Sequence, residues 1–340
     1  MRNSDSDSEA VLERMEIPAS LREAVEAALE GVPLDQLRKA SDRLTARYRS
    51  ETRDGALHLA DDLAARAYLA VRMPATYAAI RASFAVAAEL RPDFAPSSVL
   101  DVGAGPGTAL FAARDCWTSV ANAELIEASP AIRHWGERLL PLLSLQSFRW
   151  NSQDVAAARP DRQHDLVVLA YLLDELPPAA LAPLIERMWD VTAGMLIAVE
   201  PGTPAGWSRI LQLRERLIAL GAHIAAPCPH ALACPVVAPD WCHFSRRVAR
   251  SRMHRRIKFA DVPWEDEKFI YLAASREPAT PVQARVIARP QSRGGTVTLT
   301  LCNRDGTRTE PLLSRREGMR YAQARRLDWG DAIMPSDSSA

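Results

Sequence analysis

The sequence predicts an α/β protein with a Rossmann-like sheet, and two observations lead to that prediction. Mostly apolar segments at 98–102, 122–127, 165–171 and 195–199 are separated by stretches whose apolar residues recur with helical spacing. Strands that alternate with helices form βαβ units and a mostly parallel sheet. The first segment also runs directly into a glycine-rich turn, where such sheets bind ligands.

The chain before this sheet is expected to be helical. Residues 1–17 begin with a Ser/Asp-rich stretch, and we expect them to form a disordered tail. Residues 18–90 are rich in Ala, Leu, Glu and Arg, and their apolar positions recur every three to four residues, which predicts three or four helices. A Pro/Ser-rich linker then opens a domain of residues 91–276 that contains the sheet.

The glycine-rich turn is the clearest sign of a binding site. Asp101 ends the first strand, and Gly103, Gly105 and Gly107 follow before a helix begins near Thr108. Glycines permit positive φ and close approach of a ligand, and the helix N-terminus offers free N–H groups. An acid followed by G-x-G-x-G resembles motif I of class I S-adenosylmethionine-dependent methyltransferases more than a nicotinamide fingerprint. The alternative is a tight strand–helix turn that binds nothing.

Acidic residues after the later strands extend this resemblance. Glu127 ends the second strand at a spacing that suits hydrogen bonds to ribose hydroxyls. By the resemblance, Asp154 would lie near the adenine, and Asp174 and Glu175 near the methyl group. The alternative for Asp174 and Glu175 is a pair at a helix N-terminus that the helix dipole stabilises. The expected cofactor-binding residues are Asp101, Gly103, Gly105, Gly107, Glu127 and Asp154.

No recognisable catalytic group follows the fourth strand. The Asn/Asp-Pro-Pro-Tyr/Phe sequence that serves nucleobase amines is absent, and no Cys stands there as a nucleophile. Methyl transfer by positioning alone stays open, because an already nucleophilic acceptor needs only to be held against the cofactor. The sequence therefore leaves the catalytic residues unknown.

The cysteines suggest a metal site in a cysteine-rich insertion, 226–243. Of five cysteines, Cys116 lies in an apolar helix and is expected to be a core residue. The expected ligands are the other four, Cys228, Cys234, Cys242 and Cys302. Four thiolates suit an iron–sulfur cluster or a zinc ion. The wide spacing of the four cysteines favours a cluster. His230 and His243 beside them would allow a zinc site instead. Spacing alone leaves a cluster, a zinc ion and no metal open.

The net charge of zero conceals two oppositely charged parts. The chain has 42 Lys+Arg and 42 Asp+Glu, yet residues 241–330 hold 19 basic and 9 acidic residues. The run 246–258 contains seven positive charges and no acid, on Arg246, Arg247, Arg250, Arg252, Arg255, Arg256 and Lys258. An isolated run of this kind is usually a solvated helix face. Because the surplus continues along a basic, β-rich C-terminal extension, 277–330, and arginine binds phosphate bidentately, we expect an RNA-binding surface.

Several of these stretches together resemble one family. Residues 72–77, the glycine-rich turn, 171–176, 200–204 and the sequences around the cysteines are similar to the ribosome-associated methyltransferase-like family of bacteria and mitochondria. The resemblance runs from about residue 60 to 330 and implies an S-adenosylmethionine-binding fold. It also implies a 4Fe–4S cluster on the four cysteines and binding to the maturing small ribosomal subunit, whose assembly family members promote.

Three functions therefore stand at this point. The first is an assembly factor that binds S-adenosylmethionine and small-subunit rRNA and carries a structural 4Fe–4S cluster, with zinc as the alternative metal. The second is an active rRNA methyltransferase, and the third is a small-molecule methyltransferase whose basic residues are incidental. Salt-sensitive RNA binding would separate the first two from the third.

Composition excludes several other classes of protein. With 48% apolar and 25% charged residues, the chain is neither collagen-like nor wholly disordered. No apolar run is long enough to span a bilayer, and residues 1–10 lack the apolar core of a secretory signal. We expect a cytoplasmic protein that is monomeric when free, has no membrane partner, and ends in a loose tail, 331–340.

Overall fold

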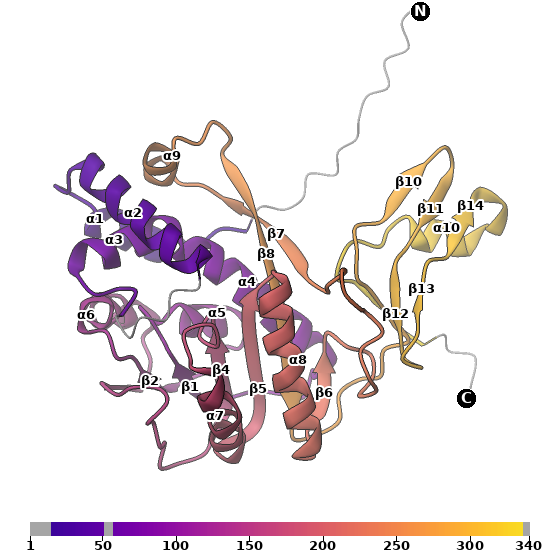
Figure 1. Ribbon diagram of the computed structural model, residues 1–340, viewed down its shortest axis with the longest axis horizontal. Helices are drawn as coiled ribbons and strands as arrows, with labels where there is room; N and C mark the ends of the chain where they lie inside the picture. Colours follow the sequence, from indigo (N-terminus) through magenta and orange to yellow (C-terminus); the bar gives the residue numbers. More distant parts are fainter. Residues whose placement is uncertain (1–14, 51–56, 336–340) are drawn as a thin grey trace, which may run out of the picture.

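A computed structural model describes residues 15–50 and 57–335. Its centre is an eight-stranded sheet in the order β3-β2-β1-β4-β5-β8-β6, with β7 paired to β8 (Figure 1). The strands are β1 (Ser98–Val102), β2 (Asn122–Ile126), β3 (Ser147–Asn151), β4 (His164–Ala170), β5 (Thr192–Pro201), β6 (His223–Ala226), β7 (Phe244–Ala249) and β8 (Trp264–Ser275). The apolar segments expected to be strands are therefore strands.

The sheet is parallel over most of its width and contains one antiparallel insertion. Strands β1 to β5 pair in parallel, whereas β8 enters between β5 and β6 and is antiparallel to both. The central strands β1, β4 and β5 are almost wholly buried, as parallel strands covered on both faces must be. The expected α/β, Rossmann-like class is confirmed.

Helices cover both faces of this sheet. The crossover helices are α5 (Thr108–Cys116), α6 (Pro130–Leu139), α7 (Pro178–Asp190) and α8 (Pro204–Ala219), with a short 3-10 turn, η1 (Leu140–Leu143). The longest helix, α4 (Met73–Leu90), is buried along most of its length and packs against α5 and β8. Two parallel strands must be joined by a crossover connection, which is usually a helix. This explains why strand-like and helical segments alternate along the sequence.

Four N-terminal helices precede the sheet, as expected. They are α1 (Ala19–Ala28), α2 (Leu34–Arg49), α3 (Asp62–Val71) and α4. The expected tail, 1–17, is wrong at its end, because Met15 forms a parallel bridge with Val248 on β7 and Ile17 is buried. Apolar packing at these two positions explains the difference, and residues 1–14 lie outside the described part of the chain.

Strands β7 and β8 extend beyond the sheet as a hairpin arm, which we define as residues 244–268. Its outer end is the short helix α9 (Arg252–Lys258), and Ala249 of β7 pairs with Trp264 of β8. Helix α9 packs on α2 and α3 (Figure 1). The arm thereby joins the β8 side of the sheet to the N-terminal helices.

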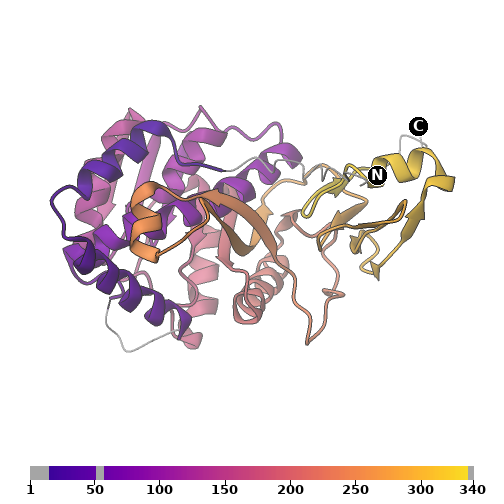
Figure 2. The same ribbon diagram turned by 90° about the horizontal axis from the view of Figure 1, so that it is seen from above.

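The C-terminal lobe, residues 283–335, stands beside the sheet, as Figure 2 shows. It contains β9 (Ala284–Val286), β10 (Gln291–Arg293), β11 (Thr296–Thr298), β12 (Leu301–Asn303), β13 (Arg308–Thr309), β14 (Leu312–Ser314), η2 (Arg315–Glu317), α10 (Met319–Ala324) and β15 (Ala332–Ile333). The expected tail, 331–340, is wrong at its beginning, because β15 pairs with β9. Residues 336–340 lie outside the described chain.

The C-terminal lobe has only a small core of its own. Seven buried apolar residues form it: Ala284, Val286, Val297, Leu299, Leu301, Leu313 and Ala324. Its strands are two or three residues long, so little apolar area is buried between them. Within the described residues, no helix is both long and apolar enough to cross a membrane.

Candidate functional site: a cofactor pocket and a four-cysteine cavity

A pocket of about 490 Å³ opens at the carboxyl ends of β1, β2 and β4. Four of the residues expected to bind the cofactor line it, namely Gly103, Gly105, Glu127 and Asp154. Ligands of open α/β sheets bind at this edge, where the loops after neighbouring strands diverge. The chain therefore brings the glycine-rich turn and the acid of the next strand together, as the sequence predicted.

The glycine-rich turn needs two of its glycines for different reasons. Gly103 has φ of +72°, and a Cβ there would lie 2.8 Å from Leu172 Cδ1. Gly105 has φ of +54° with open space around it, and its N–H donates to Glu127 Oε2 at 2.8 Å. The other oxygen of Glu127 accepts from the Ser129 N–H at 2.7 Å. These bonds fix the carboxylate at the pocket floor, although burial raises its pKa.

Two of the expected cofactor-binding residues are not among those that line the pocket. Asp101 is 2% exposed, and burial, reinforced by Glu127, raises its pKa to about 7. Gly107 caps the N-terminus of α5 with φ of +83°, and a Cβ there would lie 2.8 Å from Leu140 Cδ2. Gly107 therefore serves helix packing. The sequence pattern could not separate these roles, because a positive φ suits both a ligand contact and a helix start.

The opposite wall comes from the N-terminal helices, which sequence reasoning did not assign to the site. Tyr48 of α2, Tyr68 of α3 and Arg72 line the pocket. Nη2 of Arg72 lies 3.5 Å from Glu267 Oε1 of β8, and that same oxygen accepts from the Tyr171 hydroxyl at 2.9 Å. Only the helical spacing of residues 18–90 was visible in the sequence, and it does not reveal which strand edge the helices cover.

The loop after β4 brings further titratable groups to the pocket. Tyr171 has φ of +54°, an unusual conformation for a bulky residue and one found at functional sites. Asp174 and Glu175 both line the pocket, and burial together with Asp174 raises the pKa of Glu175 to about 8. Nδ1 of His58 lies 3.5 Å from Glu175 Oε1. The pocket thus offers charge and hydrogen bonding rather than a thiol nucleophile.

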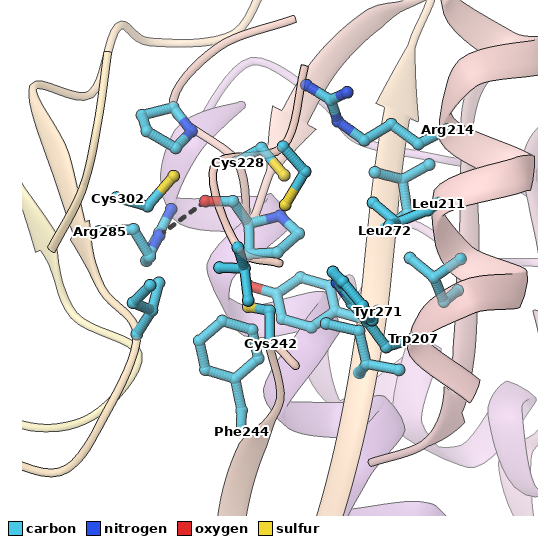
Figure 3. Close-up of a pocket in the computed structure, with 17 residues that line it drawn as sticks. Trp207, Leu211, Arg214, Cys228, Cys242, Phe244, Tyr271, Leu272, Arg285 and Cys302 are labelled. Carbon is cyan, nitrogen blue, oxygen red and sulfur yellow. Dashed lines mark hydrogen bonds between the residues drawn. The ribbon is translucent and has the colours of Figure 1, made fainter. Parts of the chain in front are cut away.

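A second cavity lies between the sheet and the C-terminal lobe, and all four candidate metal ligands line it (Figure 3). Cys228 and Cys234 lie in the loop after β6, Cys242 just precedes β7, and Cys302 is on β12. The cavity measures about 30 Å³, and apolar groups such as Phe244 and Tyr271 complete its wall. Cys116, on α5, does not line it, in agreement with its expected separate role.

Burial raises the pKa of the thiols of Cys234, Cys242 and Cys302. Burial, with the neighbouring Cys228 and Cys234, raises the pKa of Cys302 to about 12. The pKa of Cys242 is raised well above its ordinary value by burial and by the other three cysteines. Thiols that raise one another's pKa share one small volume, and a metal centre is the usual way to stabilise such a group as thiolates.

Two buried arginines flank the four thiols. Arg285 is 2% exposed; its Nε donates to Pro227 O and its Nη1 to Gly330 O, both at 2.9 Å (Figure 3). Arg214 donates through Nη2 to His230 O at 2.7 Å. Within the described chain, Arg285 Nη2 and Arg214 Nε are buried without a hydrogen-bond partner. Two guanidinium groups with unused donors beside four thiols favour an anionic occupant.

The thiols do not, however, surround a single ion. Across residues 15–50 and 57–335, no group of three or more His, Cys, Asp or Glu side chains could hold one metal ion. His230, which was considered as a zinc ligand, lies with Nε2 at 3.4 Å from Cys302 Sγ. A lobe stapled by a metal is therefore not confirmed, although its four candidate ligands converge.

The basic run is divided between two elements and partly neutralised. Arg246 and Arg247 lie on β7, Arg250 in the next loop, and Arg252, Arg255, Arg256 and Lys258 on α9. Arg247 pairs with Asp266 at 3.0 Å and Arg250 with Glu265 at 3.1 Å. Lys258 donates to Thr45 of α2 at 2.8 Å. Arg252, Arg255 and Arg256 remain exposed at the outer end of the arm.

The chain is similar to two curated proteins over most of its length. It is 29% identical over 300 residues to the human mitochondrial ribosome assembly protein METTL17, across 78% of this chain and 61% of that protein. It is 23% identical over 318 residues to the Rsm22-cox11 tandem protein 2 of Schizosaccharomyces pombe, across 78% of this chain and 42% of that protein. The chain thus spans less than two thirds of either relative.

Solved methyltransferases are similar at low identity. An O-methyltransferase family protein from Burkholderia thailandensis has a TM-score of 0.42 and 14% identity, with 76% of this chain and 72% of that one covered. The magnesium protoporphyrin IX methyltransferase of Synechocystis has a TM-score of 0.39 and 14% identity, with 73% and 100% covered.

The family described as mitochondrial small ribosomal subunit Rsm22 matches residues 62–334. This match covers the cofactor pocket's glycine-rich turn, the arm and all four cysteines of the second cavity. Because it spans well over half of the sequence, the chain belongs to the Rsm22 family.

Proposed function

We propose that the protein is an assembly factor of the small ribosomal subunit that binds S-adenosylmethionine, rRNA and a 4Fe–4S cluster. The observation that carries the proposal is the convergence of four cysteines from three chain segments on one cavity between the sheet and the C-terminal lobe. Family membership and the names of the human and fission-yeast relatives support the link to the ribosome.

S-adenosylmethionine is the proposed ligand of the 490 Å³ pocket. Glu127 would accept hydrogen bonds from the ribose, because its carboxylate is held at the end of β2 by two backbone N–H groups. Gly103 and Gly105 would let the cofactor approach the backbone. Asp154, exposed at the pocket rim, would lie near the adenine.

A 4Fe–4S cluster is the proposed occupant of the cysteine cavity. Zinc holds all its thiolates on one ion at about 2.3 Å, whereas a cluster distributes four thiolates over four irons and so accepts wider spacing. Coordination bonds are also shorter than van der Waals contacts, which reduces the empty space that a cluster requires. Arg214 and Arg285 would balance the negative charge of the cluster. The cluster would hold the C-terminal lobe in place and would not transfer electrons.

The basic outer end of the arm is the proposed rRNA contact. Arg252, Arg255 and Arg256 are exposed there, whereas Arg247 and Arg250 pair with carboxylates inside the arm and Lys258 joins it to α2. Exposed guanidinium groups bind phosphates, and the paired ones give the surface a fixed shape. The compartment stays a prediction: we expected cytoplasm, and the named relatives are mitochondrial. A monomeric free state is likewise proposed.

Methyl transfer to rRNA is the second candidate function. The partly buried group formed by Tyr171, Glu267 and Arg72 favours it, because Tyr171 and Arg72 line the pocket near the end of β4, where an acceptor would approach. These residues would position an acceptor that is already nucleophilic. A small-molecule acceptor is the third possibility, which the test below separates.

The test begins with anaerobic purification, followed by absorbance spectroscopy and analysis of iron, sulfide and zinc. We expect a brown protein with about four irons per chain, which sediments with small ribosomal subunits. Cys228→Ser should lose both colour and sedimentation, whereas the matched Cys116→Ser should keep both. A colourless protein with stoichiometric zinc would refute the cluster.

Methyl transfer is tested separately with radiolabelled S-adenosylmethionine and small-subunit assembly intermediates. Labelled rRNA that depends on Gly103 and Glu127 would establish the second candidate. Cofactor binding without labelled rRNA, together with salt-sensitive RNA affinity, is what the assembly-factor proposal expects. Absence of any RNA affinity would favour a small-molecule acceptor instead.

A further inference from the structure

Phe259 is an exposed aromatic residue at the outer end of the arm. It directly follows α9 as the C-terminal cap, with φ of +50° and ψ of +41°, and is 75% exposed. Its neighbours Arg255 and Arg256 are exposed as well. The aromatic ring of Phe259 is therefore exposed to solvent next to two positively charged side chains.

The left-handed backbone conformation of Phe259 is strained for a bulky residue and lowers the stability of the folded protein. Helices commonly end with a residue in the left-handed region, and glycine or asparagine usually occupies it. A bulky residue with positive φ is strained, because its Cβ crowds the backbone. The cap needs only the backbone, whose N–H donates to Arg255 O, and glycine would satisfy it better. The ring therefore contributes little to folding at this site.

Arg38 of α2 holds the ring in a defined position. Its Nε and Nη2 both donate to Arg256 O, at 3.1 and 2.8 Å, which ties α2 to the end of α9. Its Cζ lies 3.8 Å from the centroid of the Phe259 ring, so the guanidinium covers one face. Because the residue is 75% exposed, the opposite face is open to water.

We propose that the open face of Phe259 stacks an unpaired nucleobase of single-stranded RNA. The inference rests on the proposed rRNA binding of the arm and names the kind of RNA that it recognises. Arg252, Arg255 and Arg256 would hold the adjoining phosphates, although the carboxylate of Asp261 limits the net positive charge. A base paired within a duplex has no free face, so stacking selects single strands, loops or bulges.

Phe259→Gly separates this role from a structural one. The substitution removes the ring and relieves the positive φ, so we expect stability that is unchanged or higher. Affinity for an unstructured RNA of about ten nucleotides should fall roughly 5- to 150-fold, the range for losing one stacked base. Affinity for a fully paired RNA of the same length should change far less. Phe259→Trp should retain single-strand binding.

Met319→Ala is the control, because Met319 is 77% exposed on α10 and far from the arm in sequence. It should leave affinity for both RNAs unchanged. The proposal is wrong if Phe259→Gly binds the single strand as tightly as the natural protein, or if it loses stability together with both affinities. A defect seen only with intact subunits and not with the oligonucleotide would indicate a protein contact instead.

The experiment also distinguishes failure of the inference from failure of the proposed function. If the natural protein binds neither RNA at low salt, the rRNA-binding proposal itself is refuted, and the role of Phe259 falls with it. If it binds both RNAs and Phe259→Gly changes nothing, the arm binds RNA through its phosphates alone.

Discussion

Asp101 shows how one buried carboxyl can influence the stability of the whole sheet. It is 2% exposed at the end of β1, and within the described chain its Oδ2 has no hydrogen-bond partner. Its pKa of about 7 lies above the ordinary 3.8 because burial disfavours the charged form. The folded state therefore binds a proton that the unfolded chain releases between these two pH values.

We predict that this proton makes stability fall as pH rises. Asp101 contributes fully below pH about 4, and its contribution is lost as pH rises towards 7, a loss on the order of a few kcal/mol. Asp101→Asn cannot ionise, so the fall in stability measured by urea unfolding across this range should become less steep, while buried carboxyls such as Glu175 keep part of it. Asp165→Asn is the contrasting variant, because hydrogen bonds from Ser97 and Ser98 help to lower the pKa of Asp165 and its stabilisation grows with pH. An unchanged slope in Asp101→Asn would contradict the assignment.

Individual site residues were predictable only where one residue type has one role. Glu127 lines the pocket beside the glycine-rich turn, as its spacing predicted, and its contact with a ribose stays a prediction. Asp101 and Gly107 fit the same motif, yet one is buried below the pocket and the other packs against Leu140. Phe259 gave no signal at all, because positive φ and exposure are properties of the folded chain.

Among the elements, the arm can be removed with the least damage to the sheet. Ala249 and Trp264 are direct partners across the β7–β8 pair, so a two-residue turn can join them. We predict that replacing residues 250–263 by Asn-Gly leaves cofactor binding intact and lowers RNA affinity at least about tenfold, because several phosphate contacts are lost. Calorimetric titration with each ligand measures both effects.

The matched control for this deletion keeps the arm and removes only its charge. Arg252→Gln, Arg255→Gln and Arg256→Gln together should lower RNA affinity and flatten its dependence on salt. Tighter or unchanged RNA binding after the deletion would show that the contact lies elsewhere, for example on the C-terminal lobe.

Elements were more predictable than their contacts. Periodicity located the N-terminal helices and the strands β1, β2, β4 and β5 of the sheet, because apolar runs and helical spacing follow from local geometry, but it did not locate β3, β6 or β7. It assigned 246–258 to one basic surface, whereas the chain builds a strand, a loop and a helix from it. Ion pairs such as Arg247 with Asp266 depend on the β7–β8 register, which the composition of a single run does not contain.

At the scale of the whole molecule, the C-terminal lobe depends on its junction with the sheet. Its own core has seven buried apolar residues, and Arg285 ties it through Pro227 O to the loop that carries Cys228. We predict that removing the proposed metal centre with a chelator speeds hydrogen exchange in β9 and β12 by about tenfold or more, because local opening then costs less. Exchange in β1 and β4 should not change.

Cys116→Ser provides the control for that experiment, since its thiol lies on α5 away from the cavity. It should retain the protection of β9 and β12 before treatment and lose it after treatment, as the natural protein does. Equal exchange with and without metal would mean that hydrogen bonds such as those of Arg285 hold the lobe without help.

Strand β8 passes every site described above. Its outer half belongs to the arm, Glu267 contacts Tyr171 and Arg72 of the pocket at the glycine-rich turn, and Tyr271 and Leu272 line the cysteine cavity. A slip of one residue would turn each of these side chains to the opposite face of the sheet. A ligand that restrains β8 at one site therefore lowers the conformational entropy of the strand. Binding at either of the other two sites then costs less conformational entropy.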